Sequence, residues 1–285
     1  MIRFSPYPAG AEGTPSPRCL IAASVWLLAS AAISFAQTPA AQAIDHGVAA
    51  MGQGDFAGAE QAFRRAVEAE PKNARAWKAL GVAFAAQGVH AEASEPFSKA
   101  CALDRKEADA CYYLARNHYL LNRFAESLAI FDKLARDAKG DWRFANGRGL
   151  ALLAMARYPE AEEAFQRAID TEGGRTSQRG GASPDEDPSV NLGNLYSRSG
   201  QPEKARDVLR AFLRRKPAAA RGWFELGKVE LQLGLLDEAR ASLLSALQTR
   251  PQYREAHLLL SKVYGRLGDG AKAEEQRNLG LARQP

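Results

Sequence analysis

Cysteine, histidine and methionine are scarce in this chain, and their scarcity excludes several classes of protein. Its 285 residues include three Cys, four His and three Met. Three Cys cannot cross-link a scaffold of this length, and the sequence holds no Cys-x-x-Cys pair or close His/Cys cluster from which structural zinc sites are built. We therefore expect neither a disulfide-rich scaffold nor a metal site.

An excess of charge of one sign is missing as well. The 38 basic and 33 acidic residues leave a net charge of +5. So mild a bias is not the footprint of a nucleic-acid-binding protein, and we expect no nucleic acid among the partners. With 46% hydrophobic and 25% charged residues, the composition is that of an ordinary globular chain. It excludes global disorder and a membrane protein with several spans.

A long apolar run lies near the N-terminus. No charged residue interrupts Leu20–Phe35, Arg18 precedes this run, and a small-x-small sequence ending at Ala36 follows it. This order predicts a secretory signal at residues 1–36, cleaved after Ala36, and hence a periplasmic or secreted protein. The alternative is an uncleaved N-terminal anchor at residues 20–36, because the run reaches the lower limit for spanning a bilayer. We expect contact with a membrane only in that second case.

From residue 40 onward the sequence repeats. A recurrent turn is marked by Gly54, Gly88, Asn122, Ala156, Gly200, Gly234 and Gly268. These residues are 34 positions apart except for one interval of 44, so one unit carries ten additional residues. Apolar side chains at helical spacing flank each turn, which predicts a helix, a tight turn and a second helix in every unit. Such a unit cannot bury its apolar face alone, so the units must stack.

The repeated positions resemble the tetratricopeptide repeat family, whose pattern is W-x2-L-G-x2-Y, then A-x3-F, then P over 34 residues. The second unit carries Trp77, Leu80 and Gly81 of this pattern, and the sixth carries Trp223 and Gly227. The resemblance implies an all-α fold, a right-handed α-solenoid of about seven helix-turn-helix repeats. Arg277 stands in the last unit where most units have Phe or Leu, which suits a terminal repeat with a polar outer face.

The additional residues divide the array. We expect repeats 1–4 at residues 40–175, a flexible insertion at 176–185 and repeats 5–7 at 186–285. The segment 171–188 is rich in Gly and mixed charge, which predicts a mobile loop. A lid, a protease-sensitive link, a partner contact and a tolerated surface insertion stay open as its role. Within the second unit, Pro96 removes a helical hydrogen bond, so we expect a kink or a late helix start there.

Two cysteines fall at the junction of neighbouring units. Cys101 ends one predicted helix and Cys111 lies in the first turn of the next, so a short loop brings them together. In an exported protein a disulfide between them is one interpretation, and two buried free thiols are the other.

Signatures of covalent chemistry are missing from the sequence. It contains no phosphate loop, dinucleotide fingerprint, His-Glu-x-x-His sequence or nucleophile elbow. The four His are spread along the chain, and we expect them to be structural residues. We therefore expect no catalytic residue and no cofactor, in a protein that is not an enzyme.

In the family that this chain resembles, the first helices line a concave groove through positions 2, 5, 9, 12 and 13 of each repeat, and extended peptides or partner helices lie there. The corresponding candidate residues here are Val48, Met51, Val82, Tyr112, Arg116, Tyr119, Leu150, Leu153, Asn194, Arg198, Arg221, Lys228, Lys262 and Arg266. Their N-terminal half is mostly apolar, and their C-terminal half is mostly basic, opposed by Asp187 and Glu255. We expect a protein or peptide partner with an apolar and an acidic segment.

The function expected from this surface is a non-catalytic protein-protein interaction scaffold of the cell envelope or exported space. The alternative is an architectural or self-associating module of an envelope membrane complex. The sequence leaves the oligomeric state and the identity of the partner open.

Overall fold

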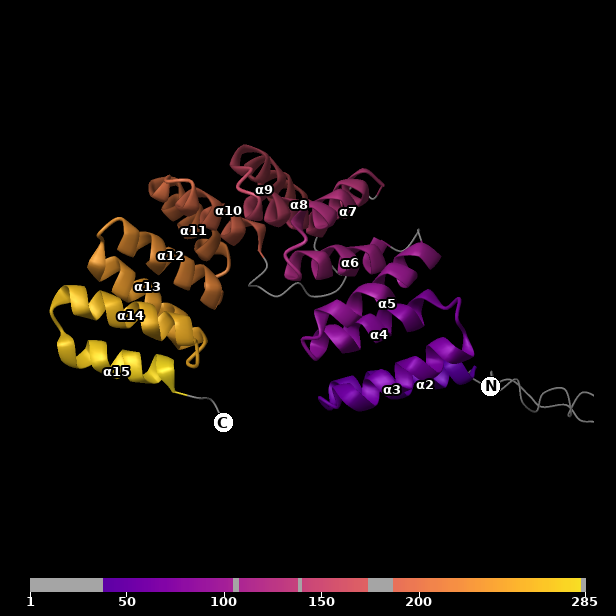
Figure 1. Cartoon of the computed structure of the whole chain (residues 1–285). Coiled ribbons are helices and arrows are strands. Elements are labelled where there is room, and N and C mark those ends of the chain that lie inside the picture. Colours follow the sequence, from indigo (N-terminus) through magenta and orange to yellow (C-terminus); the bar gives the residue numbers. More distant parts are fainter. Residues whose placement is uncertain (1–37, 105–107, 138–139, 174–186, 283–285) are drawn as a thin grey trace, which may run out of the picture.

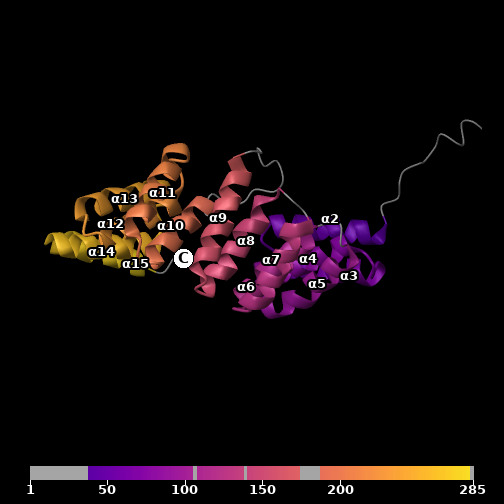
Figure 2. The same ribbon diagram turned by 90° about the horizontal axis from the view of Figure 1, so that it is seen from above.

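The computed structural model describes residues 38–104, 108–137, 140–173 and 187–282. These residues form fourteen helices and no strand, arranged as seven successive pairs along a curved row (Figure 1). In the view from above, the first and last pairs lie at opposite ends of that row (Figure 2). The expected all-α solenoid of about seven repeats is therefore confirmed.

Each repeat consists of a first and a second helix. The first helices are α2 (Pro39–Gly52), α4 (Ala74–Ala86), α6 (Ala108–Leu120), α8 (Trp142–Ala154), α10 (Pro188–Arg198), α12 (Ala220–Gln232) and α14 (Arg254–Leu267). The second helices are α3 (Phe56–Ala69), α5 (His90–Leu103), α7 (Phe124–Asp137), α9 (Tyr158–Gly173), α11 (Pro202–Arg215), α13 (Leu236–Thr249) and α15 (Gly270–Leu281).

The turns within the repeats share a left-handed backbone residue. At Gly54 and Gly88 the angle φ is 77°, and the residues at the equivalent positions of the other units also have positive φ. Two of these residues are not glycine, because Asn122 and Ala156 adopt φ of 58°. A side chain with a Cβ atom is strained in this region by roughly 1–2 kcal/mol. The turn geometry is thus retained even where the residue is unfavourable.

Small residues let the two helices of a repeat approach closely. A Cβ atom on Gly81 would lie 2.6 Å from Cδ1 of Phe97, and one on Gly149 would lie 2.5 Å from Cε1 of Phe165. Both Phe side chains are buried, at 1% and 0% exposure. Each aromatic ring of the second helix therefore occupies the space that a side chain on the first helix would need.

The two rows of helices stack differently, and the difference sets the curvature. Every first helix contacts the first helix of the next repeat, whereas no described second helix contacts another second helix. Second helices contact only first helices, including the one that follows in the next repeat. The first helices therefore form the inner row of the arc. Their side chains that point away from the second helices line its concave face.

Stacking continues across the division between repeats 4 and 5. α9 packs against α10, and one core cluster of buried side chains extends from α7 to α12. Phe165, Leu195 and Phe212 lie in this cluster, each with 0% exposure. The predicted insertion at 176–185 falls outside the described residues.

Three further expectations concern the ends of helices and of the chain. α5 begins at His90, in register with the other second helices, and is continuous through Pro96, so the expected late start is wrong. In α15 the buried side of the helix is reduced to Gly280, as suits a terminal repeat. No helix of the described residues is long and apolar enough to cross a bilayer. The predicted signal segment at 1–36 lies outside them.

Candidate partner-binding site

The concave face contains two hollows, which together include eight of the fourteen predicted groove residues. The larger, which we call the N-terminal hollow, has a volume of about 850 Å³ and lies among α2, α4 and α6. The smaller, which we call the central pocket, has a volume of about 230 Å³ and is formed by side chains of α6, α7, α8, α10 and α12.

Apolar side chains line much of the N-terminal hollow. The predicted residues Val48, Met51 and Val82 contribute, together with Leu103 and Tyr113, which the sequence analysis did not select. Val48 is 54% exposed although it is aliphatic. The Tyr113 ring stacks on the buried Phe97 ring at a centroid distance of 5.7 Å, which fixes its position. Apolar side chains gathered in a hollow and open to water are typical of binding surfaces.

Charged residues surround this hollow in a defined arrangement. Lys72, Arg75 and Lys78 come from α4 and the loop before it, whereas Asp104 and Asp109 come from the junction of α5 and α6. The two groups of opposite charge belong to different walls. An occupant with charges at both ends of an apolar segment would match this arrangement.

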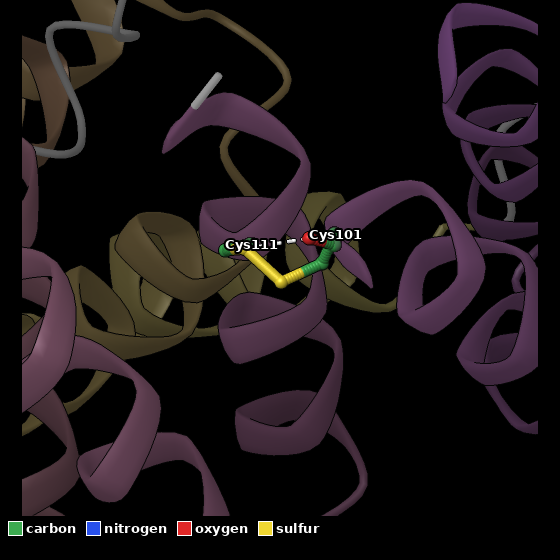
Figure 3. The surroundings of a disulfide bond; sticks show 2 residues. All are labelled: Cys101 and Cys111. Atoms are coloured by element: carbon green, nitrogen blue, oxygen red, sulfur yellow. Dashed lines mark hydrogen bonds between the residues drawn. A yellow bond between two sulfur atoms is a disulfide. The ribbon is translucent and has the colours of Figure 1, made fainter. Parts of the chain in front are cut away.

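A disulfide lies beside the acidic wall. Cys101 and Cys111 are bonded, with their Cα atoms 4.7 Å apart, and join the end of α5 to the first turn of α6 (Figure 3). Leu103 and Asp104 follow Cys101 closely, and Tyr113 lies two residues after Cys111. The cross-link therefore constrains the part of the chain from which that wall is built.

Five of the predicted groove residues line the central pocket, namely Tyr112, Arg116, Tyr119, Leu150 and Arg221. Sequence reasoning missed its other polar members, Arg143, Asn146 and Asn191. Leu153 does not belong to the groove, because it is 5% exposed and packs in the core cluster that extends from α7 to α12.

Arginine side chains gather around one aromatic ring in this pocket. The guanidinium carbons of Arg143 and Arg116 lie 5.1 and 5.7 Å from the centroid of the Tyr112 ring. Arg143 donates hydrogen bonds to Asp141 Oδ2 at 2.6 Å and to Asp109 Oδ1 at 3.0 Å. Hydrogen bonding to Asp141, together with both carboxylate charges, raises the pKa of Arg143 above its ordinary value, although burial opposes this.

In the basic C-terminal half, the acid that pairs with a predicted groove residue is not one that the sequence analysis named. Asp187 does not oppose it, because this carboxylate is buried, caps α10 by accepting from the Ser189 N–H at 2.8 Å, and accepts from Lys216 Nζ at 2.6 Å. The acid that faces the groove residues is Glu225, which pairs with Lys228.

Glu225 also accepts a hydrogen bond from Asn194 Nδ2 at 3.3 Å. Glu225 lies three residues before Lys228 on the same helix, and this spacing in the sequence is the signal that could have predicted their ion pair. Arg198, Lys262 and Arg266 remain exposed on the same side of the array, and Arg266 donates to the Leu231 carbonyl at 3.4 Å. None of the residues that the structure describes form a cluster of three or more His, Cys, Asp or Glu suited to a metal ion.

Comparison with known proteins identifies the family. The family model described as tetratricopeptide repeat matches residues 44–110, 112–176 and 190–254. The chain therefore belongs to the tetratricopeptide repeat family, whose fold is that of protein-protein interaction scaffolds. A search of the curated proteins finds no match.

Solved structures share the fold. A tetratricopeptide repeat protein from Parabacteroides merdae aligns with a TM-score of 0.67 at 15% identity, covering 86% of this chain and 99% of that one. PilF from Pseudomonas aeruginosa aligns with a TM-score of 0.59 at 20% identity, covering 79% and 97%.

A chain of the Cut9–Hcn1 hetero-tetramer of APC/C aligns with a TM-score of 0.66 at 19% identity, covering 84% of this chain and 45% of that one. This chain thus spans less than half the length of that structure. At these identities the likeness concerns the fold alone.

Proposed function

We propose that this chain is a non-catalytic scaffold of the cell envelope or exported space that binds a polypeptide partner along its concave face. The observation that carries the proposal is the N-terminal hollow of about 850 Å³, in which apolar side chains from three successive repeats face water. Burying these side chains against a partner would be favourable, because it removes apolar surface from water. Lys72, from the loop before α4, and Asp104, from the junction of α5 and α6, would then orient the partner.

The shape of this surface favours a polypeptide as the occupant. Val48, Val82 and Tyr113 belong to consecutive first helices, so apolar contacts recur from one repeat to the next. A helix or extended peptide presents apolar side chains at a matching regular spacing. The row of first helices continues from the hollow to α8, α10 and α12, whose side chains contribute to the central pocket.

Peptide selection tests this proposal even though the partner is unidentified. The full chain is offered a displayed library of random peptides, and an enriched peptide is then synthesised and titrated by fluorescence anisotropy. The variant Val48→Asp/Val82→Asp places charges in the N-terminal hollow, and we expect it to weaken binding about tenfold or more. The matched control is Leu244→Asp, an exposed aliphatic residue on the second helix α13.

Binding that is equally strong to all three proteins would refute the groove as the site. Light scattering of the full chain separates the proposal from self-association, because a mass that rises with concentration would favour the architectural module. Export is tested by the mass of the chain recovered from the cell envelope. An N-terminus at Gln37 supports cleavage after Ala36, and a chain that retains residues 20–36 in the membrane supports the anchor.

A further inference from the structure

The second and sixth repeats carry the same tryptophan but surround it differently. Trp77 on α4 and Trp223 on α12 occupy the same position in their repeats. Trp77 Nε1 donates to the Pro71 carbonyl at 2.8 Å, and Trp223 Nε1 donates to the Pro217 carbonyl at 2.7 Å. Because equivalent hydrogen bonds fix the two indoles, their surroundings can be compared directly.

In the second repeat the chain covers its own tryptophan. Lys99 Nζ on α5 lies 4.2 Å from the centroid of the Trp77 ring and pairs with Glu95 Oε1 at 2.7 Å. An ammonium at this distance is attracted by the negative face of the indole. Further along α4, the guanidinium carbon of Arg64 lies 5.5 Å from the centroid of the Phe84 ring. An ion pair and a second aromatic ring thus accompany Trp77.

The sixth repeat has different side chains at these positions. Where α5 has its ion pair, α13 has Ala241 and Ser245, and where α4 has Phe84, α12 has Glu230. A hollow of about 420 Å³ lies here among α11, α12 and α13, with Trp223 among its lining residues. We call it the convex pocket, because it lies between the second helices α11 and α13.

Buried side chains define the interior of the convex pocket. Leu213 and Leu226 provide apolar walls. Glu230, which is 1% exposed, accepts from Arg210 Nη2 at 2.8 Å and from Ser242 Oγ at 2.6 Å. A buried carboxylate is stable when it is paired and hydrogen-bonded in this way. Glu230 is therefore held by its own neighbours, and the apolar walls and the indole are the surface that an occupant would contact.

We propose that the convex pocket binds a lysine side chain of a partner polypeptide, with its ammonium over the Trp223 ring. The choice of occupant follows from the second repeat, where Lys99 has the equivalent place over Trp77. The methylene groups of a lysine suit the apolar walls. This site goes beyond the proposed function, because it lies on the side of the array opposite to the concave face.

Exposed charges at the rim determine where the ammonium lies. Glu238 belongs to α13 and Arg214 to α11, and both are exposed. Attraction by Glu238 and repulsion by Arg214 direct a cation toward α13, the helix equivalent to the one that carries Lys99. A volume of about 420 Å³ accommodates one long side chain, so the pocket is suited to a single lysine.

Tryptophan side-chain NMR measures binding at this site directly. The indole N–H signals of the full chain are titrated with N-acetyllysine methylamide and with N-acetylnorleucine methylamide, which has the same aliphatic chain without the ammonium. We expect the lysine derivative to shift the Trp223 signal in a saturable manner and to bind about fivefold tighter than the norleucine derivative. The Trp77 signal is the internal control, because Lys99 already covers that ring.

Transferring the ion pair of the second repeat tests the geometry. Ala241→Glu/Ser245→Lys places a lysine of the chain itself beside Trp223, and we expect the dissociation constant of the lysine derivative to rise about tenfold or more. Leu244→Lys adds a lysine at an exposed position of α13 that is not among the residues lining the pocket, and should leave this constant unchanged. Unshifted Trp77 and Trp142 signals in both variants show that the fold is retained.

Equal binding of the norleucine derivative would assign the pocket to an aliphatic side chain and overturn the proposal. The absence of a saturable Trp223 shift, an equal shift of the Trp77 signal, or unchanged binding to Ala241→Glu/Ser245→Lys would also overturn it. The outcome is separate from that of the peptide selection, because Val48 and Val82 belong to the first helices of other repeats.

Discussion

The two ends of the concave face are built on the same repeat but use it differently. At the N-terminal end the first helices α2, α4 and α6 leave an apolar hollow between them. At the C-terminal end the first helices are connected by polar side chains, such as Asn194 to Glu225 at 3.3 Å and Ser197 to Gln232 Oε1 at 2.8 Å. The backbone frame is common to both ends, so a few variable side chains decide whether a surface is open to a partner or is occupied by internal contacts.

The core between the two ends provides the largest expected effect. Phe165 has 0% exposure in the cluster that extends from α7 to α12, so Phe165→Ala should lower the free energy of unfolding by about 3–5 kcal/mol. Urea unfolding measures the change, and hydrogen exchange shows whether the two ends then open separately. Leu244→Ala, at an exposed position, should change stability by less than about 0.5 kcal/mol. A similar small change for Phe165→Ala would show that the ends do not depend on this core.

Reduction of the disulfide should affect only the N-terminal end. Because the bond closes a short loop, its loss is expected to destabilise the fold by about 2–4 kcal/mol. Hydrogen exchange in α5 and α6 should accelerate on adding a dithiol, while exchange in α12 and α14 stays the same. The Cys101→Ser/Cys111→Ser variant should behave like the reduced protein. Two free thiols in the protein purified without reductant would contradict the bond.

The N-caps of α3 and α10 allow a matched comparison, and removing either should reduce stability by an intermediate amount. Asp187 caps α10 while buried and paired with Lys216, whereas Asp55 caps α3 at an exposed position, accepting from the Gly58 N–H at 2.8 Å. We expect Asp187→Ala to cost about 2 kcal/mol, because it also leaves the Lys216 charge without this partner, and Asp55→Ala about 1 kcal/mol. Chemical denaturation measures both, and equal losses would mean that burial adds nothing.

The smallest expected effect concerns the turns. Ala156 adopts φ of 58°, so Ala156→Gly should stabilise the chain by about 1 kcal/mol. Gly200 occupies the equivalent turn of the next repeat with φ of 78°, and Gly200→Ala should destabilise by a similar amount. Thermal unfolding gives the two signs, and the same sign for both would refute the strain argument.

The fold could be predicted because the same helix-turn-helix pattern recurs in seven units. A Gly, Asn or Ala recurs at each turn, and α4, α6 and α8 begin 34 residues apart, at Ala74, Ala108 and Trp142. Each unit thus provides an independent check on the register. Of the two outcomes predicted at Pro96, a kink or a late start, the late start is wrong, because stacking against neighbouring helices outweighs the hydrogen bond lost there.

The candidate site was harder to predict, because the position of a residue within its repeat does not show which side chains of other repeats it contacts. Leu153 shares its repeat position with the half-buried groove residues Met51 and Tyr119, but α10 and α12 complete a core around it. Arg221 was selected as part of a basic end, yet Asn191, thirty positions earlier, directs it into the central pocket. Which side chains pair across repeats depends on such distant neighbours, and a single sequence does not reveal them.

The contact pattern of the two helix rows has a mechanical consequence. The first helices touch one another along the inside of the arc, whereas described second helices are separated from one another by first helices. A small change in the angle between neighbouring repeats therefore breaks few contacts between second helices on the outside of the arc. Such changes add up over seven repeats. The curvature of the array should therefore be able to change by small steps at each junction of repeats, and least at the junction of α5 and α6, where the disulfide links the two helices.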